Sequence, residues 1–397
     1  MPLQDPLSLV AFLLALVAGI FYLSRIQRLD KLFAFVPPVL WCYFVPMLLT
    51  TFGILPPSSP VYDWMSGYGL LVALFLLMVT SDVRAILRLG PRAGLMMLAG
   101  TIGIVIGGIV AFSLFKGLLP ADAWMGFGAL SGSWIGGTAN MVAVKEGLGA
   151  PDSVLAPIIV VDTVVGYGWM GLLLFLSRYQ HRFDAWTKAD PALLARLEAT
   201  DFGTVEKRPT TTADLAIIVG LALGVAVAIK LLSAHIPTLD VAWGGRDVTI
   251  ISRSTWAILL VVTAGLTLSF TPVRKLDEVG GSAVGNYALY ALLATIGAQA
   301  DLAKVAEFPA YMLAGALWLS IHVGVMVLAA KMLRAPLFLL ATGSMANVGG
   351  AASAPIVATT FHRTLAPVGL VMAVAGYILG IYFAFLTANI LGLIAGG

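Results

Sequence analysis

Long apolar stretches, separated by short polar connections, run along almost the whole chain of 397 residues. A helix that spans a membrane needs about 20 apolar residues, and stretches of this length recur in both halves of the sequence. They lie near residues 6–24, 33–54, 62–80, 93–116, 122–147, 152–177, 214–234, 254–270, 283–300, 310–333, 335–361 and 364–394. The pattern predicts an all-α integral membrane protein.

Composition supports a membrane location, since 60% of the residues are hydrophobic and 11% are charged. Soluble domains carry about a quarter charged residues, so much of this surface must face the lipid bilayer. A formal charge of +3 argues against a nucleic-acid partner. The single cysteine cannot form a disulfide within the chain, and the four scattered histidines give no zinc pattern. We therefore expect no cofactor apart from a coupling ion.

Polarity divides the chain into three parts. Residues 1–178 form a first membrane repeat, 179–213 a soluble polar linker, and 214–397 a second membrane repeat. The first apolar stretch is followed by Arg25, Arg28 and Lys31, which predicts a first membrane helix rather than a cleaved signal peptide. We expect a multi-pass protein of the cell inner membrane.

Short motifs recur in the same order in the two halves. Leu155-Ala-Pro157 with Gly166-Tyr167 matches Leu365-Ala-Pro367 with Gly376-Tyr377 at an offset of 210. The segments 132–137 and 343–350 also match, as do 97–100 and 312–315. Single matches are common in a chain rich in Leu, Ala and Gly, but a shared order indicates a duplicated unit.

Basic residues predict how the two repeats are oriented. Connections 25–31, 82–92, 178–213, 271–275 and 331–334 carry Lys or Arg, and placing them all on the cytoplasmic side makes the repeats antiparallel. Such inversion requires an odd number of crossings in each half, whereas six stretches are counted. Either one stretch of each half fails to cross or one crossing has been missed.

Two glycine-rich segments interrupt apolar stretches at matching places, Ser131–Asn140 and Thr342–Ser353. Glycine costs a helix interior about 1 kcal/mol, so each Gly-Gly pair predicts a break. The backbone groups that a break frees inside a membrane must bind protein, solute or water. The alternative is close packing of unbroken helices through small residues. Under the first interpretation the solute-binding residues are Ser131, Ser133, Gly136, Gly137, Thr138, Asn140, Thr342, Ser344, Asn347 and Ser353.

Asp162 is an acid inside the apolar stretch that follows the first interruption. Burying a charge at bilayer depth costs about 2.5–3.5 kcal/mol, so such an acid usually has a function. Its counterpart in the second repeat is Met372, and the duplication therefore does not require it. We predict that it couples transport to Na⁺ or H⁺; the alternative is a protonated structural acid. The predicted coupling residues are Asp162, Thr163, Asn140 and Asn347.

His322 lies within another apolar stretch. It is a candidate proton relay, and a structural histidine is an equally good interpretation.

The run Gly132-Ser-Trp-Ile-Gly-Gly-Thr-Ala-Asn-Met-Val-Ala143, together with Ala298-Gln-Ala-Asp301 and the stretch with His322, resembles the YjcL-like family of bacterial and plastid membrane proteins (domain of unknown function 819). That family is grouped with the cation:proton antiporter and anion transporter superfamily. The resemblance implies core and panel domains, two crossed discontinuous helices, elevator-type movement and a homodimer. It also implies that Asp162 occupies the place of the cation-binding carboxylate.

The sequence therefore predicts a secondary transporter that moves a small polar or anionic organic solute with Na⁺ or H⁺ by alternating access. Amino acids, small peptides, organic acids and nucleobase-like compounds all fit. Cation/proton antiport is the alternative, although Val161 stands where antiporters carry a second polar residue. A channel or an intramembrane enzyme fits less well, because neither requires a duplicated unit, and we expect no enzymatic activity.

Overall fold

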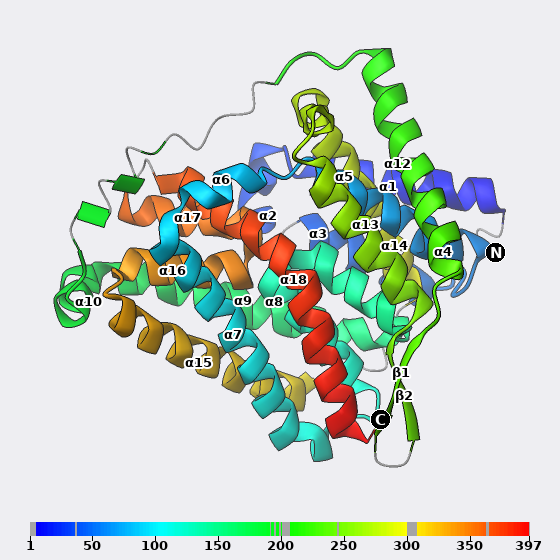
Figure 1. The fold of residues 1–397 in the computed structure, drawn as a ribbon. Coiled ribbons are helices and arrows are strands. Elements are labelled where there is room, and N and C mark those ends of the chain that lie inside the picture. The colour runs from blue at the N-terminus through cyan, green and yellow to red at the C-terminus, as the bar shows by residue number, and fades with distance from the viewer. Residues whose placement is uncertain are drawn as a thin grey trace.

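The computed structural model describes residues 5–35, 38–190, 192, 193, 196, 197, 200, 207–243, 246–299, 308–362 and 365–396. Helices occupy every apolar stretch predicted from the sequence (Figure 1). The first half contains α1 (Pro6–Leu23), α2 (Asp30–Phe35), α3 (Pro38–Thr51), α4 (Pro60–Trp64), α5 (Leu70–Val79), α6 (Val83–Arg88), α7 (Gly90–Phe115), α8 (Ala123–Leu148), α9 (Leu155–Leu176) and α10 (Gln180–Thr187). The second half contains α12 (Thr212–Ala234), α13 (Arg253–Leu268), α14 (Gly281–Gln299), α15 (Phe308–Leu333), α16 (Leu337–Val348), α17 (Gly350–Phe361) and α18 (Ala366–Ala395).

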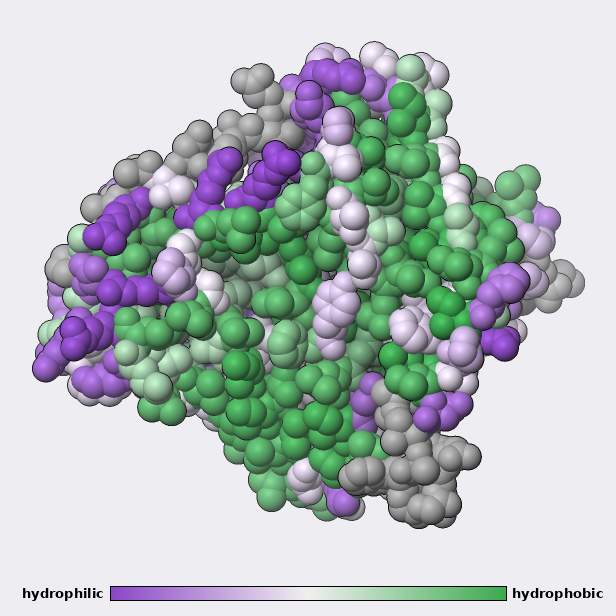
Figure 2. Space-filling model, viewed as in Figure 1, coloured by the Kyte–Doolittle hydropathy of each residue, from purple (hydrophilic) through white to green (hydrophobic). Residues whose placement is uncertain are grey.

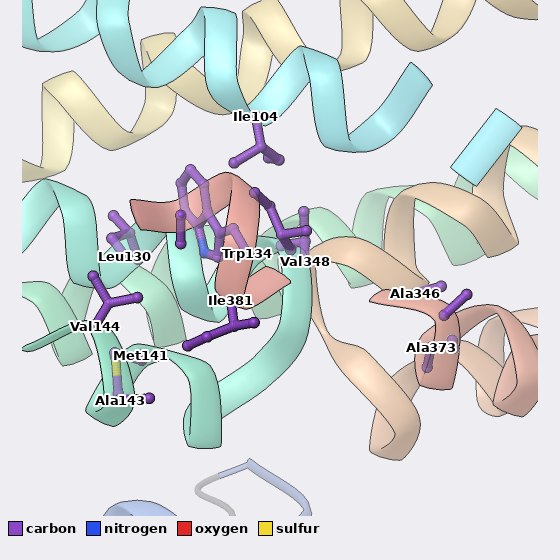
Figure 3. Packing of buried hydrophobic residues seen from close by; sticks show 14 of the residues in the cluster. Ile104, Leu130, Trp134, Met141, Ala143, Val144, Ala346, Val348, Ala373 and Ile381 are labelled. Carbon is purple, nitrogen blue, oxygen red and sulfur yellow. The ribbon is translucent and has the colours of Figure 1, made fainter. Parts of the chain in front are cut away.

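Within the described ranges, seven helices are long and apolar enough to cross a membrane. The number rises to eight if Arg253–Leu268 and Pro272–Val279, which bend by 94°, form one span. The face shown in Figure 2 is covered by hydrophobic residues, and hydrophilic residues gather toward its edges. The chain is therefore a multi-pass membrane protein.

Among the described residues, a small β-hairpin is the one departure from the helical fold that the sequence predicts. Strand β1 (Leu239–Trp243) pairs antiparallel with β2 (Arg246–Ile251). Two β-rich runs separated by Gly244 and Gly245 are a hairpin signal, which is easily missed because the segment lies between two long apolar stretches. The strands are too short to cross a bilayer, so the membrane part of the fold remains helical.

The helices form two bundles that lie side by side in Figure 1. The core bundle consists of α7, α8, α9 and α15–α18, and the panel bundle of α1, α3, α5 and α12–α14. Helix α8 packs most extensively against α18, and α7 against α15, so the two halves of the sequence interleave within the core bundle. The bundles meet mainly where α13 and α5 contact α8.

Polar contacts gather the predicted cytoplasmic connections at one end of the molecule, the basic end. Arg92 pairs with Asp190 at 2.9 Å, and Arg274 pairs with Asp82 at 3.0 Å. The Lys331 ammonium donates to the Trp186 carbonyl, which joins the end of α15 to α10. The hydrogen bond from Arg92 holds the pKa of Asp190 below its usual range. These contacts join four of the five connections that were predicted to share a side, either directly or through the linker.

Helix α8 is a hairpin rather than a straight helix. A Cβ atom added to Gly132 would lie 2.8 Å from the Asn140 carbonyl oxygen, and one added to Gly128 would lie 3.3 Å from Leu148 Cδ1. A straight helix would separate Gly128 from Leu148 by about 30 Å, at 1.5 Å per residue. The two arms therefore run back along each other, and both ends of α8 lie on the same side.

The second interrupted segment folds in the same way. Helices α16 and α17 are joined at Gly349, and the rings of Phe338 and Phe361, from their outer ends, lie 6.1 Å apart. The first hairpin opens toward the end of the molecule opposite the basic end. Glu146, near the end of α8, accepts a hydrogen bond from Ser66. Ser66 and Asp82 lie at opposite ends of the segment that contains α5, and Asp82 lies at the basic end. The second follows directly on α15, whose last turn lies at the basic end.

These hairpins correct the expectation of two crossed discontinuous helices. Each interrupted segment enters and leaves the core bundle on one side, and the two enter from opposite ends. A hairpin adds no crossing, and neither interrupted segment is among the seven helices of the described ranges that are long and apolar enough to span a membrane. The same order of helix, hairpin and helix occurs in α7–α9 and in α15–α18.

Candidate functional site

Both hairpin tips are built on glycine conformations. Gly137 has φ 76° and ψ −178°, and the preceding Gly136 is also non-helical. Gly350 has φ 63°. Residues with a Cβ rarely adopt positive φ, which explains why a Gly-Gly pair stands at each tip. The predicted breaks are confirmed.

The two tips meet at one residue of α18, Tyr377. A Cβ atom added to Gly137 would lie 3.0 Å from Cε1 of this ring, and one added to Gly350 would lie 3.3 Å from its hydroxyl oxygen. That hydroxyl accepts a hydrogen bond of 3.1 Å from the backbone N–H of Ala351, which has no partner within its own helix. Asn140 donates to the Tyr377 carbonyl at 2.9 Å. Tyr377 therefore links the two hairpins.

A cavity of about 80 Å³ opens beside the tips, between the core and panel bundles. The core contributes residues of both hairpins and of α9, and the panel contributes Tyr43 of α3 and Leu293 of α14. Its lining comprises Tyr43, Ser133, Gly137, Thr138, Met141, Ile159, Asp162, Thr163, Gly166, Tyr167, Leu293, Met345, Val348 and Gly349.

Asp162 lies in this lining and faces the first hairpin. The Ser133 hydroxyl donates a hydrogen bond of 2.8 Å to its Oδ2 atom. The Trp134 indole lies beside the same carboxylate, although its N–H makes no hydrogen bond of ordinary geometry. Thr163 donates to the Ile159 carbonyl, so the lone pairs of its hydroxyl remain free to accept. A carboxylate with hydroxyl neighbours at a cavity wall can hold a proton or a small cation.

The structure places five of the predicted residues on the cavity wall: Ser133, Gly137, Thr138, Asp162 and Thr163. Two further predicted residues lie behind it. Gly136 packs against Asn140 and α18, and Ser353 donates to the Gly349 carbonyl at the second tip.

The remaining predicted residues make contacts within the core bundle. Asn347 accepts from Thr101 at 3.1 Å and donates to the Gly343 carbonyl at 2.9 Å. Ser131 donates to the Gly128 carbonyl. The Thr342 hydroxyl and the Asn140 amide oxygen are buried without a hydrogen-bond partner among the described residues. These contacts are those expected of residues that stabilise the hairpins. A role for these side chains in solute or ion binding stays a prediction.

His322 belongs to a buried hydrogen-bond chain away from the cavity wall. Its Nδ1 lies 3.0 Å from the Gly100 carbonyl, which can only accept, so Nδ1 carries the proton. Its Nε2 then accepts from the Ser344 hydroxyl at 2.8 Å, and that hydroxyl accepts from Trp169 Nε1 at 2.9 Å. Every group has a partner, and the chain ties together α7, α9, α15 and α16. This arrangement favours the structural interpretation of His322 over a proton relay.

Three tyrosines of the site were not singled out by the sequence. Tyr43 and Tyr167 line the cavity, and Tyr377 joins the hairpin tips. Tyr167 and Tyr377 are counterparts in the repeated Gly-Tyr motif, so the motif that indicated the duplication also marked the site. Nothing in the local sequence distinguishes Tyr43, which reaches the cavity from the panel bundle.

The bundles are joined by polar contacts at the end opposite the basic end. The buried Lys145 ammonium pairs with Glu146 at 2.9 Å and with Asp152, while Ser66 of the panel donates to Glu146 at 3.1 Å. The neighbouring carbonyl of Gly147 accepts from three hydroxyls at the start of α13. These are Ser252 at 2.8 Å, Ser254 at 3.1 Å and Thr255 at 2.9 Å.

Two helical bundles with a polar cavity between them define a multi-pass helical membrane protein. The family described as protein of unknown function (DUF819) matches residues 11–394, and the chain belongs to that family. The chain is also similar to the uncharacterized membrane protein YjcL of Bacillus subtilis (strain 168), with 27% identity over 365 residues. The match covers 86% of this chain and 87% of that relative. Asp301, quoted above among the residues of the resemblance, lies outside the described residues.

Proposed function

We propose that the protein is a secondary active transporter that moves a small polar organic solute across the bilayer, coupled to Na⁺ or H⁺ by alternating access. The observation that carries the proposal is the cavity between the two bundles, where both hairpin tips converge with Asp162. Hairpins that enter from opposite ends provide one barrier on each side of such a cavity. An alternating-access carrier needs both barriers.

Coupling is assigned to Asp162. A carboxylate at this depth is costly unless it is neutralised by a proton, a cation or a partner. Ser133 supplies one hydrogen bond, and no basic side chain of the described residues lines the cavity. Binding of Na⁺ or H⁺ therefore neutralises the carboxylate and lowers the free energy of the state in which the cavity is closed. The core bundle would move against a panel bundle that forms the homodimer contact.

A carrier explains the site better than an enzyme or a channel. A Ser–His pair does exist, Ser344 with His322, but both residues are completely buried and neither lines the cavity. A water-reactive nucleophile would need access to substrate. A channel would not require two hairpins that meet at a shared tyrosine.

The test is transport by the purified protein in proteoliposomes. Uptake of isotopically labelled metabolite pools into the vesicles is measured with and without a Na⁺ or pH gradient. A carrier gives a saturable signal, and unlabelled solute inside the vesicles accelerates uptake of labelled solute. Unsaturable flux would indicate a channel, covalent change of the solute would indicate an enzyme, and either result would refute the proposal.

A further inference from the structure

The charge of the cavity limits the class of solute it can bind. Among the described residues that form its wall, Asp162 is the one charged side chain, and none is Lys, Arg or His. The hydrogen bond that its carboxylate accepts comes from a neutral hydroxyl, that of Ser133. An ionised Asp162 therefore gives the cavity a negative charge that no lining residue balances.

The nearest cluster of charges does not compensate for this. Lys145 pairs with both Glu146 and Asp152, so its positive charge is shared by two carboxylates and the cluster carries one excess negative charge. Asp152 lies close enough to Tyr43, on the cavity wall, to act electrostatically on its hydroxyl. An anionic solute would therefore enter a negative potential.

The other residues of the cavity wall suit an organic cation better than a metal ion. Tyr43 and Tyr167 supply aromatic rings, and Met141 and Met345 supply polarisable thioethers. Rings of this kind attract ammonium groups, most strongly where water is excluded. The Tyr43 hydroxyl is buried and has no hydrogen-bond partner among the described residues. Such a group costs free energy unless a bound molecule satisfies it.

We propose that the solute is a small organic amine, whose ammonium group pairs with Asp162 and whose second polar group bonds the Tyr43 hydroxyl. This inference rests on the proposed transport function and names its substrate class. Because Asp162 balances one positive charge, the ammonium group and the coupling ion bind in turn and not together. The amine is then exchanged for Na⁺ or H⁺.

Three probes of similar size and different charge test this inference: ethanolamine, ethylene glycol and glycolate. Each is titrated against the purified protein in phosphate buffer, because many common buffers are amines, and the midpoint of thermal unfolding is followed. Ionic strength is held constant with KCl. Ethanolamine is expected to raise the midpoint, and the other two probes are not. The coupling ion, Na⁺ or H⁺, is then added at ten times its Kd. The ethanolamine concentration that gives half-saturation should rise about tenfold.

Two variants separate the residues involved. Tyr43→Phe keeps the ring and removes the hydroxyl, so it should weaken ethanolamine about threefold to tenfold while leaving methylammonium, which has no second polar group, unchanged. Asp162→Asn should abolish the response to both amines. A matched variant on the protein surface, Asp63→Asn, should respond like the wild type.

The outcomes distinguish this inference from the proposed function. Stabilisation by glycolate or ethylene glycol in place of ethanolamine would overturn the amine assignment and leave coupled transport standing. Amine and ion effects that add instead of competing would overturn the exchange. Failure of any solute, whatever its charge, to show saturable counterflow in proteoliposomes would refute the transport function itself.

Discussion

The Ser133 hydroxyl lies 2.8 Å from Oδ2 of Asp162 and donates its hydrogen to that oxygen. The bond joins the first hairpin to α9, so a change in what the Asp162 carboxylate binds would alter the hydrogen bond that holds the hairpin. This contact makes the carboxylate the first residue to test.

Replacement of Asp162 by Asn removes the charge and keeps the shape. We expect ion-driven uptake in proteoliposomes to fall below a tenth of the wild-type rate, because an amide cannot take up a proton or balance a cation at this depth. Expression and the unfolding midpoint should remain close to the wild type. Asp63→Asn, at an exposed position in α4, is the matched control. Full uptake by Asp162→Asn would remove this residue from the mechanism.

The tip of the first hairpin should not tolerate a side chain. Gly137→Ala places a Cβ at a φ of 76° and 3.0 Å from the Tyr377 ring, and strain of this kind costs about 1–3 kcal/mol. We expect a lower unfolding midpoint and slower transport. Gly168→Ala in α9, where an added Cβ meets nothing within 4 Å, should be neutral. Equal behaviour of the two variants would mean that the tip relaxes freely.

Tyr377 should matter through its hydroxyl as well as its ring. Tyr377→Phe leaves the Ala351 N–H without its partner, at a cost of about 1–3 kcal/mol for a buried group. Hydrogen exchange at the start of α17 should accelerate while exchange in α7 is unchanged. Tyr22→Phe, at a residue that is 71% exposed, is the control. Unchanged exchange at α17 would show that the hydroxyl does not hold the tip.

Lys145 should be needed for stability. Its side chain is 4% exposed and pairs with two carboxylates. Lys145→Met leaves both acids without their cation, and breaking a buried ion pair in this way costs about 3–5 kcal/mol. Chemical denaturation in detergent measures the loss. The triple variant Lys145→Met, Glu146→Gln and Asp152→Asn should recover part of it, and no recovery would point to packing instead of charge.

The hydroxyls at the start of α13 should bias the arrangement of the two bundles. Ser254→Ala combined with Thr255→Val leaves the Gly147 carbonyl with one donor, although its two lone pairs can accept two. The loss is about 1 kcal/mol and hence about fivefold in population. Spin labels at Leu114 of α7 and Leu231 of α12, both exposed, would report the distance distribution in a Cys42→Ala background. Thr267→Val, at an exposed position in the same helix, is the control. Identical distributions would exclude a role for this contact.

Much of the fold follows from the sequence, because each apolar stretch must be a helix in lipid. The positions of the breaks were also predictable, since a Gly-Gly pair with positive φ has few substitutes. The reversal at each break was not, because a glycine pair permits a kink and a hairpin equally. What decides between them is contact across the arms, such as Gly132 with Asn140 and Phe338 with Phe361.

The site was predictable in part for a similar reason. Asp162, Ser133 and Thr138 were indicated by local chemistry, the cost of a charge and of freed backbone groups in a membrane. The panel's contribution to the cavity was not, since Tyr43 is one aromatic residue among many until α3 is placed against the core bundle. Conversely, Ser344 and Asn347 had the right chemistry but find partners within the core.

The Gly147 carbonyl faces three hydroxyl donors at the start of α13. A carbonyl oxygen has two lone pairs, so one donor is always in reserve. In the proposed transport cycle, movement of α13 past this point would let a bond pass from one hydroxyl to the next before the previous one is lost. The two bundles could therefore shift along each other while at least one hydrogen bond between α13 and α8 is kept.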